Sequence, residues 1–248
     1  MHRFYVPSDE WNTDALVLKE SEAHHCRNVL RLGSGDKVVL FNGRGSEITA
    51  AIVRSDDAAI HLRKLHQAET PPLRCQITLG QAVPKGKNMD LIVQKAVEIG
   101  AAEIVPILSD RTVVRLDAET ASSKRAKWQT VAIEAAKQCG QNWLPEVGMP
   151  QTLARFFQTR RPFELQLIGS LQSDALHLKK ILQQHAEAYG NRPANVLMLV
   201  GPEGDFTPAE LSLARSQGCR PITLGPIVLR VETAAIYCLS ILSYELLV

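Results

Sequence analysis

Cysteine is scarce and scattered in this sequence. The 248 residues contain five cysteines, at positions 26, 75, 139, 219 and 238. The number is odd, and no two of them form a CxxC pair. This pattern argues against a disulfide framework and against a zinc site, and it favours the reduced thiols of a cytoplasmic protein.

Long apolar runs are also missing. No apolar stretch approaches the ~20 residues that a helix needs to span a bilayer, and residues 1–5 lack the apolar region of a signal peptide. The net charge is only +2, which neither requires nor excludes RNA as a partner. Whether the protein binds RNA must therefore be judged from local clusters of basic residues. A hydrophobic content of 45% is nevertheless enough for a substantial core.

Two common phosphate-binding motifs are absent. There is no Gly-Lys-Ser/Thr of a P-loop, and no GxGxxG follows an early strand, which argues against a Rossmann dinucleotide site. The glycine pairs at 33/35 and 43/45 lie beside short alternating runs, where hairpin turns are the better interpretation.

The hydrophobic pattern changes once along the chain. Short alternating runs at residues 37–42, 48–53 and 60–65 predict a small β-rich domain, a barrel, over residues 1–70. Pro71 and Pro72 end a polar linker. Over residues 73–248 strands alternate with helices, which predicts an α/β domain with a parallel sheet. Its expected strands are residues 76–83, 103–108, 165–168, 196–200 and 222–224.

Helix boundaries are well marked in the second domain. Asn88 is predicted to cap a helix that stops at Gly100. A capping box, Thr207 to Glu210, precedes a helix that ends at Gly218. The apolar face of the first of these helices is predicted to be Met89, Ile92, Val93, Ala96 and Val97.

The last helix is expected to begin around Glu232, and residues 234–248 are largely apolar. So much apolar surface at a terminus predicts burial in the core or in a subunit interface.

The most informative features are two loops near the C-terminal end. Residues 201–206 (GPEGDF) and 224–234 (LGPIVLRVETA) each follow a short apolar strand and lead into a helix. An open α/β sheet binds its ligand at such strand ends, where glycine lets the backbone approach closely. The loops can hold a flat, mostly neutral group such as adenine, which S-adenosylmethionine contains, although Gly-Pro pairs after strands are also common as simple turns.

These loops resemble the last two motifs of the SPOUT class of RNA methyltransferases. The nearest resemblance is to the bacterial family that methylates N3 of a uridine in 16S ribosomal RNA, and it covers nearly the whole chain. The matching segments, in the family's order, are residues 2–5 (HRFY), 24–31 (HHCRNVLR), 87–90 (KNMD), 94–101 (QKAVEIGA), Arg111, 134–140 (EAAKQCG) and the two loops. Asp205 stands where a second glycine is usual, and Gln141 where an arginine is usual.

The resemblance implies a fold and a set of partners. It implies a PUA-like β-barrel RNA-binding domain over residues 1–70 and a SPOUT methyltransferase domain with a C-terminal trefoil knot over residues 73–248. It also implies a homodimer, S-adenosyl-L-methionine as the cofactor, and 16S rRNA of the small ribosomal subunit as the partner. Periodicity alone predicts no knot.

Site residues follow from the loops and the resemblance. Arg230 and Glu232 are the candidate catalytic residues, because methylation of uracil N3 requires removal of a proton and stabilisation of the resulting anion. The candidate RNA-binding residues are Arg3, Arg27, Arg31, Arg111 and Arg115. The candidate cofactor-binding residues are Leu199, Val200, Gly201, Glu203, Gly204, Leu224, Gly225, Ile227 and Leu229.

Several alternatives remain open from the residues alone. Arg230 can form a structural ion pair with Glu232, Glu203 can bridge locally, and His24 and His25 can serve packing. The chain can be a methyltransferase acting on another RNA, such as a tRNA ribose 2′-OH, or an RNA-binding module that has lost its cofactor.

Overall fold

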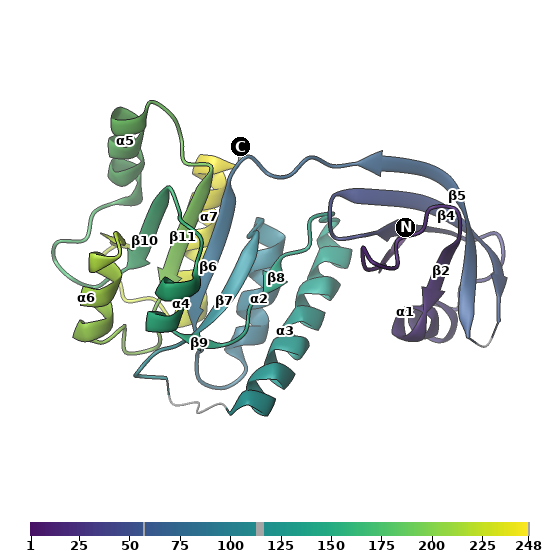
Figure 1. Cartoon of the computed structure of the whole chain (residues 1–248), viewed down its shortest axis with the longest axis horizontal. Helices are drawn as coiled ribbons and strands as arrows, with labels where there is room; N and C mark the ends of the chain where they lie inside the picture. The colour runs from purple at the N-terminus through teal and green to yellow at the C-terminus, as the bar shows by residue number, and fades with distance from the viewer. Residues whose placement is uncertain (57, 113–116, 248) are drawn as a thin grey trace. The chain divides into compact units, whose positions relative to one another are not determined.

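The computed structural model describes residues 1–56, 58–112 and 117–247. They form two compact units (Figure 1). Unit 1 consists of Met1–Pro72 together with Ile133–Leu144, and unit 2 consists of Leu73–Ala132 together with Pro145–Val248. Residues 133–144 are therefore part of unit 1, although they are separated from the rest of it in the sequence.

Unit 1 is built on a five-stranded sheet. Its strands are β1 (His2–Tyr5), β2 (Leu16–Lys19), β3 (Lys37–Phe41), β4 (Ser46–Ser55) and β5 (Ala59–Glu69), in the order β1-β3-β4-β5-β2. All pairs are antiparallel except β1 with β3. The alternating runs correctly predict β3, β4 and β5, whereas β1 and β2 are too short to be recognised from their pattern. Among the described residues, β1 and β2 lie at the two ends of this sheet and do not pair with each other, whereas a closed barrel is expected.

A short helical segment completes the core of unit 1. Helix α1 (Glu20–His24) continues directly into a π-helical turn, η1 (His25–Val29). Ala23 and Cys26 point into the apolar core and are almost fully buried. The ring of His25 packs edge-on against Phe4, with centroids 6.2 Å apart, which fits a packing role for this histidine.

The segment that returns to unit 1 is held by the turn between β3 and β4. Gly45 N donates to Asn142 O at 3.0 Å, Leu144 N donates to Gly43 O at 3.1 Å, and Trp143 Nε1 donates to Thr70 O at 2.8 Å. Asn142 is buried, and its amide donates to Glu47 and to Thr70. Because both chain segments contribute to this network, unit 1 is complete only when residues 142–144 are in place.

Helix α3 (Ala118–Cys139) belongs to both units, since its last turns fall within Ile133–Leu144. Within unit 1, Lys137 Nζ lies 2.5 Å from a carboxylate oxygen of Glu22, and both side chains are less than one fifth exposed. Burial raises the pKa of Glu22, and its hydrogen bond to Lys137 opposes that shift. The pair therefore ties the end of α3 to α1 at a desolvation cost.

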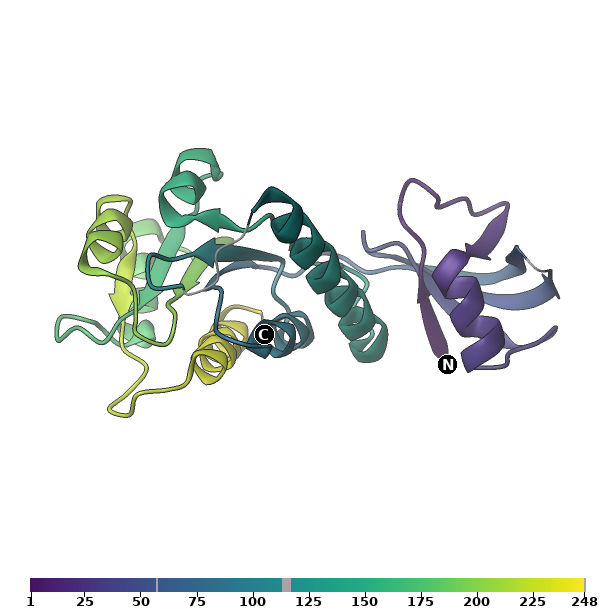
Figure 2. The ribbon, with the colours of Figure 1, turned by 90° about the horizontal axis from the view of Figure 1, so that it is seen from below.

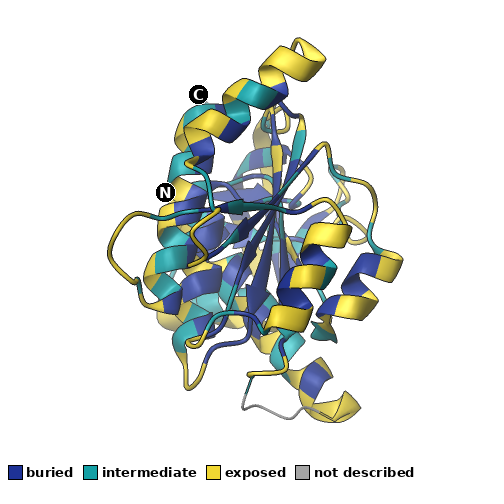
Figure 3. Cartoon of the chain, turned by 90° about the vertical axis from the view of Figure 1, so that its left-hand side faces the viewer, coloured by how far each residue is buried: buried dark blue, intermediate teal, exposed yellow. Residues whose placement is uncertain are grey.

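Unit 2 contains an entirely parallel sheet with the order β12-β10-β11-β6-β7-β8, and β9 also pairs with β7. The sheet is buried on both sides, as its dark colour in Figure 3 shows, which is usual for parallel sheets. The strands are β6 (Gln76–Ala82), β7 (Glu103–Leu108), β8 (Glu146–Val147), β9 (Gln151–Thr152), β10 (Leu165–Gly169), β11 (Asn195–Val200) and β12 (Arg220–Ile222).

Helices cover both faces of this sheet. On one face α2 (Asn88–Ile99) and α7 (Val231–Leu246) lie side by side (Figure 2). On the other face α4 (Leu153–Thr159) and α6 (Pro208–Ser216) pack on a core that contains Leu197 and Leu199. Helix α5 (Leu178–Tyr189) connects β10 to β11. An α/β fold is therefore confirmed for this part of the chain.

The structure confirms most helix predictions and corrects two details. The capping box of Thr207 and Glu210 is present, and the predicted apolar face of α2 is its buried face. Asn88 is not the cap of α2, because the N-cap position is Lys87 and no side chain caps that end. Strand β12 lies two residues earlier than predicted. It is the last strand at its end of the sheet, and beyond its pairing with β10 it has only an isolated bridge from Ile222 to Leu176 among the described residues. Such an edge position tolerates Pro221, which argues against a strand in the sequence.

Helix α7 accounts for much of the apolar C-terminal sequence within one chain. Its buried residues include Ala235, Leu239 and Leu242, and the helix packs against β6, β11 and α2. Among the described residues, no helix has the length and apolar character to cross a membrane.

Gly45 offers a test of the contact that completes unit 1. Its φ is +96°, and a Cβ there meets Thr70 O at 2.6 Å and the Trp143 ring at 2.9 Å. We expect Gly45→Ala to lower the free energy of unfolding by about 2–3 kcal/mol, measured by urea denaturation with tryptophan fluorescence. Gly33→Ala is the matched control, since no atom lies within 4 Å of its Cβ position. Equal stability of the two variants would contradict this account of the turn.

Candidate active site

A pocket of about 700 Å³ opens at the carboxyl ends of β10, β11 and β12. Its walls come from the loops that follow these strands and from the N-terminal residues of α2 and α7. The chain runs from β10 to its neighbour β11 and then back past β10 to β12. The pocket therefore lies where successive connections run in opposite directions along the sheet, which is the usual ligand site of an open α/β sheet. Its volume is in the range of small-molecule sites.

The two loops singled out in the sequence meet in this pocket. Both candidate catalytic residues, Arg230 and Glu232, line it. Of the candidate cofactor-binding residues, seven line it: Val200, Gly201, Glu203, Leu224, Gly225, Ile227 and Leu229. The other two do not. Leu199 is fully buried in the core beneath α6, because neighbouring residues of a strand point to opposite faces. Gly204 is exposed, and a Cβ there would lie 3.6 Å from the Arg111 side chain.

A third loop, at the end of β10, also lines the pocket. It contributes Gly169, Ser170, Leu171 and Gln172, none of which is predicted from the sequence. The signal was present, because the strand itself is predicted and the rule that ligands bind at strand ends applies to it as well. Asn88, at the start of α2, also lines the pocket and is not among the candidate site residues.

The loop after β11 is held in shape by its own polar groups. Asp205 has a φ of +63°, and its Oδ1 accepts a hydrogen bond of 2.7 Å from Phe206 N. Aspartate tolerates this left-handed conformation better than most residues do, which accounts for its presence at a position where glycine is usual. Glu203 Oε1 accepts from Lys85 N at 2.9 Å, so Glu203 does bridge to a neighbouring loop while lining the pocket.

Glu210 joins this region to the loop after β7. It is only 7% exposed. One carboxylate oxygen accepts from Thr207 N, Thr207 Oγ1 and Ser109 Oγ at 2.9–3.1 Å, and the other accepts from Asp110 N at 3.0 Å. The Glu210 carboxylate thus caps α6. It also holds residues 109–110 in place through its hydrogen bonds to Ser109 and Asp110.

Arg111 extends this connection to the pocket loop. Its Nη1 donates to Gly204 O, and the rest of the side chain is exposed. The candidate RNA contact at Arg111 therefore also supports the loop after β11. Arg115 lies outside the residues that the structure describes.

The two candidate catalytic residues differ in their surroundings. Arg230 is exposed at the N-cap position of α7. Glu232, half-buried one residue inside the helix, accepts a hydrogen bond of 3.0 Å from Asn88 Nδ2. Among the described residues, the two do not form an ion pair with each other, so the structural pairing considered from the sequence does not occur.

The candidate RNA-binding residues of unit 1 fall into different environments. Arg3 is only 14% exposed and is engaged with Glu47, Asn142 and the ring of Phe41, which fits a structural role. Desolvation opposes ionisation of Glu47, but hydrogen bonds from Asn142 and Arg3 leave its pKa lowered. Arg31 is exposed and has a φ of +55°.

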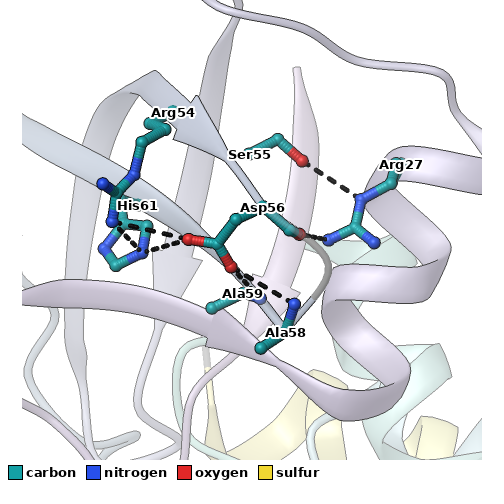
Figure 4. A network of polar contacts seen from close by, with 7 residues as sticks. All are labelled: Arg27, Arg54, Ser55, Asp56, Ala58, Ala59 and His61. Atoms are coloured by element: carbon teal, nitrogen blue, oxygen red, sulfur yellow. Dashed lines mark hydrogen bonds and ion pairs between the residues drawn. The ribbon is translucent and has the colours of Figure 1, made fainter.

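Arg27 is tied to the hairpin between β4 and β5 (Figure 4). Its guanidinium donates to Ser55 Oγ at 3.1 Å and to Asp56 O. Backbone hydrogen bonding from Ala59, together with a side-chain bond to His61, lowers the pKa of Asp56. Arg54 lies 3.4 Å from the same carboxylate. Arg27 therefore stabilises the hairpin as well as presenting charge there.

Comparison with known proteins assigns the chain to a family. A family model described as an RNA methyltransferase domain matches residues 71–243, and one described as an RNA methyltransferase PUA domain matches residues 18–65. Ribosomal RNA small subunit methyltransferase E of Bacillus subtilis is 30% identical over 229 residues, which cover 90% of this chain and 88% of that protein. The chain belongs to the ribosomal RNA small subunit methyltransferase E family. The resemblance expected from the sequence is thus confirmed, including its PUA-like N-terminal domain.

Solved structures support the same assignment. A methyltransferase E from Neisseria gonorrhoeae, solved with S-adenosylmethionine, has a TM-score of 0.86 and is 29% identical, with 99% of this chain and 98% of that one covered. A methyltransferase from Legionella pneumophila, solved with the same cofactor, has a TM-score of 0.87 and is 33% identical, with coverage of 98% and 97%. The methyltransferase E fold thus spans nearly the entire chain.

Glu210 is the residue on which the support of the pocket loop can be tested. Glu210→Ala leaves the donors of Thr207, Ser109 and Asp110 without their acceptor, and we expect it to lower the free energy of unfolding by about 2–4 kcal/mol. Glu210→Gln keeps the size and one acceptor and should cost less. Urea denaturation of both variants measures the difference. A loss below ~1 kcal/mol for Glu210→Ala would show that the network adds little.

Proposed function

We propose that this protein transfers a methyl group from S-adenosyl-L-methionine to N3 of a uridine in 16S rRNA of the small ribosomal subunit, in the cytoplasm. The observation that carries the proposal is the pocket at three parallel strand ends, which Arg230 and Glu232 line together with the two glycine-containing loops. Membership of the methyltransferase E family supports the substrate class.

The residues present fit the cofactor. Leu224, Ile227 and Leu229 supply apolar surface for an adenine ring. A Cβ at Gly225 would face open space, and its φ of +108° allows a backbone path that other residues rarely adopt. Glu203, Asp205 and Glu232 also line the pocket, and their charge suits a ligand that carries an ammonium and a sulfonium group.

Glu232 and Arg230 supply what the uridine requires. When bound, S-adenosylmethionine provides an electrophilic methyl group and retains the sulfur–carbon bonding electrons on leaving. N3 of uracil carries a proton, so Glu232 accepts that proton as a general base. The negative charge that develops on the ring is shared with O2 and O4, where the Arg230 guanidinium stabilises it. N3 lies on the base-pairing edge, and the base must therefore be unpaired when it enters the pocket.

Exposed cations provide the sequence-independent contacts. Arg31 in unit 1 and Arg111 in unit 2 are both exposed, and we assign phosphate contacts to them. Such contacts position an RNA but do not read its sequence. With a net charge of only +2, selection of one uridine therefore depends on the shape of a preformed RNA surface, which the assembled small subunit offers.

The test of the function compares three substrates. Purified protein and labelled cofactor are offered small subunits, protein-free 16S rRNA and bulk tRNA, all from a strain that lacks the gene. We expect methylation of small subunits at uridine N3, detected by mass mapping, and much slower transfer to free rRNA. Equal or faster transfer to free rRNA would contradict the assembly requirement, and transfer to tRNA alone would replace the proposed target.

Gly201→Val provides the control for cofactor binding in this assay. A Cβ at Gly201 lies 3.1 Å from Asp205 Oδ1 and 3.2 Å from Phe206 N, so a larger side chain displaces the loop itself. We expect calorimetry to show no cofactor binding by this variant and the assay to show no transfer. If the wild-type protein also binds no cofactor, the chain is a binding module rather than an enzyme.

We further propose that the protein is a homodimer through the outer face of α7. Tyr237 and Tyr244 lie two turns apart on this helix and are 45% and 76% exposed, and Ile227 and Val228, just before it, are 74% and 73% exposed. Aromatic side chains of this kind are enriched in subunit interfaces.

Sedimentation measures the oligomeric state directly. We expect the wild-type protein to sediment as a dimer at micromolar concentration, and a Tyr237→Arg, Tyr244→Arg double variant to sediment as a monomer. Tyr189→Arg, which changes an exposed tyrosine on α5, is the matched control. A wild-type protein that is monomeric and active would exclude the dimer as a requirement.

A further inference from the structure

Asn88 has a role that its position in the sequence does not predict. At the start of α2 it is placed to cap the helix, but no side chain caps that end. Its amide instead donates a hydrogen bond of 3.0 Å to Glu232 Oε2, near the start of α7, and both residues line the pocket. The two helices pack against each other. The bond therefore joins their N-terminal ends where these ends line the pocket.

The bond distinguishes Glu232 from the other carboxylates of the pocket. Glu203 and Asp205 accept hydrogen bonds from backbone N–H groups and so hold their loops in shape. Glu232 is instead held by a side-chain amide through one oxygen, Oε2. Among the described residues, its other oxygen, Oε1, has no hydrogen-bond partner in the protein, which leaves it to accept from a molecule in the pocket.

The chemical nature of the donor matters for a base. An arginine or lysine partner would orient a carboxylate but would also weaken it as a base, because a nearby positive charge favours the ionised form strongly. A neutral amide orients the carboxylate with a smaller effect of this kind. Arg230 is the one cation that lines the pocket among the described residues, and it is not paired with Glu232.

We propose that Asn88 is a positioning residue that orients Glu232 for proton abstraction. This inference rests on the role of Glu232 in the proposed function. Asn88 holds Oε2, and Oε1 takes the proton from N3 of the uridine. The carboxylate becomes a neutral carboxylic acid, and it returns the proton to water after the product has left.

A purely structural role for the bond makes different predictions. If it serves only to join α2 to α7, loss of Asn88 lowers stability, and its effect on the reaction is independent of Glu232. If Asn88 acts through Glu232, its loss has no further effect once Glu232 can no longer accept a proton. A double-mutant cycle separates these two cases.

The cycle uses Asn88→Ala, Glu232→Gln and the double variant, in single-turnover methylation of small subunits with saturating cofactor. We expect Glu232→Gln to slow the reaction by ~100-fold or more and Asn88→Ala by ~10–100-fold. The double variant should be no slower than Glu232→Gln. Gln94→Ala, an exposed position on α2, should leave the rate unchanged. Additive losses in the double variant, or an unchanged rate in Asn88→Ala, would overturn the proposal.

A second measurement needs no RNA. The Glu232 carboxyl carbon is followed by NMR and assigned by its absence in Glu232→Gln. Because the Asn88 amide donates to Glu232 Oε2, we expect the chemical shift of this carbon to change in Asn88→Ala and to stay at its wild-type value in Gln94→Ala. The other ionisable groups that line the pocket, Glu203, Asp205 and Arg230, are unchanged in these variants.

The two measurements separate the inference from the proposed function. If the wild-type protein methylates no RNA, the proposed function fails, and the carboxyl signal still decides whether Asn88 controls Glu232. An identical Glu232 carboxyl signal in wild type and Asn88→Ala would overturn the inference even if methylation is robust.

Discussion

The parallel pairing of β6 with β11 is the constraint on which the site depends. Six residue pairs, from Gln76 with Asn195 to Gln81 with Val200, align the two strands so that they end at the same edge of the sheet. The next residues of β11 form one pocket loop, and the chain after β6 leads into Asn88. Gly80 makes the pairing close, since a Cβ there would lie 2.4 Å from the Leu199 side chain. The pocket is therefore a consequence of strand register, and its walls come from segments more than 100 residues apart.

Much of this arrangement is predictable because it rests on local patterns. The strands of the parallel sheet are continuous apolar runs, the capping box of α6 is a four-residue signal, and the two glycine-containing loops follow strands directly. The same local reasoning fails where a residue's hydrogen-bond partner lies far away in the sequence. Asn88 can cap its own helix, but Glu232 competes for its amide, and no sequence pattern near Asn88 indicates this. Leu199 is predicted to line the pocket because it precedes the loop after β11. Its side chain instead lies in the core on the α6 side of the sheet, because alternate residues of a strand point to opposite faces.

The family resemblance adds information that hydrophobic periodicity and capping signals do not contain. It identifies the methyltransferase class and the PUA-like domain, both confirmed by comparison. The trefoil knot and the homodimer remain predictions of the resemblance. Arg3 illustrates the limit of transferring roles by motif alone, because its guanidinium is engaged with Glu47 and Asn142 inside unit 1. Arg31, in the next matching segment, is exposed and remains suited to RNA.

The return of residues 133–144 to unit 1 affects the order in which the protein can fold. Met1–Pro72 leaves the ribosome first, but Asn142, Trp143 and Lys137 are still unsynthesised at that point. At about 5–20 residues per second, the missing segment follows roughly 4–14 seconds later. During that interval Glu47 lacks the Asn142 amide and Glu22 lacks Lys137. The β3–β4 turn also lacks its hydrogen bonds to residues 142–144. The N-terminal unit therefore cannot be completed before Leu73–Ala132, about a third of the methyltransferase unit, has been made.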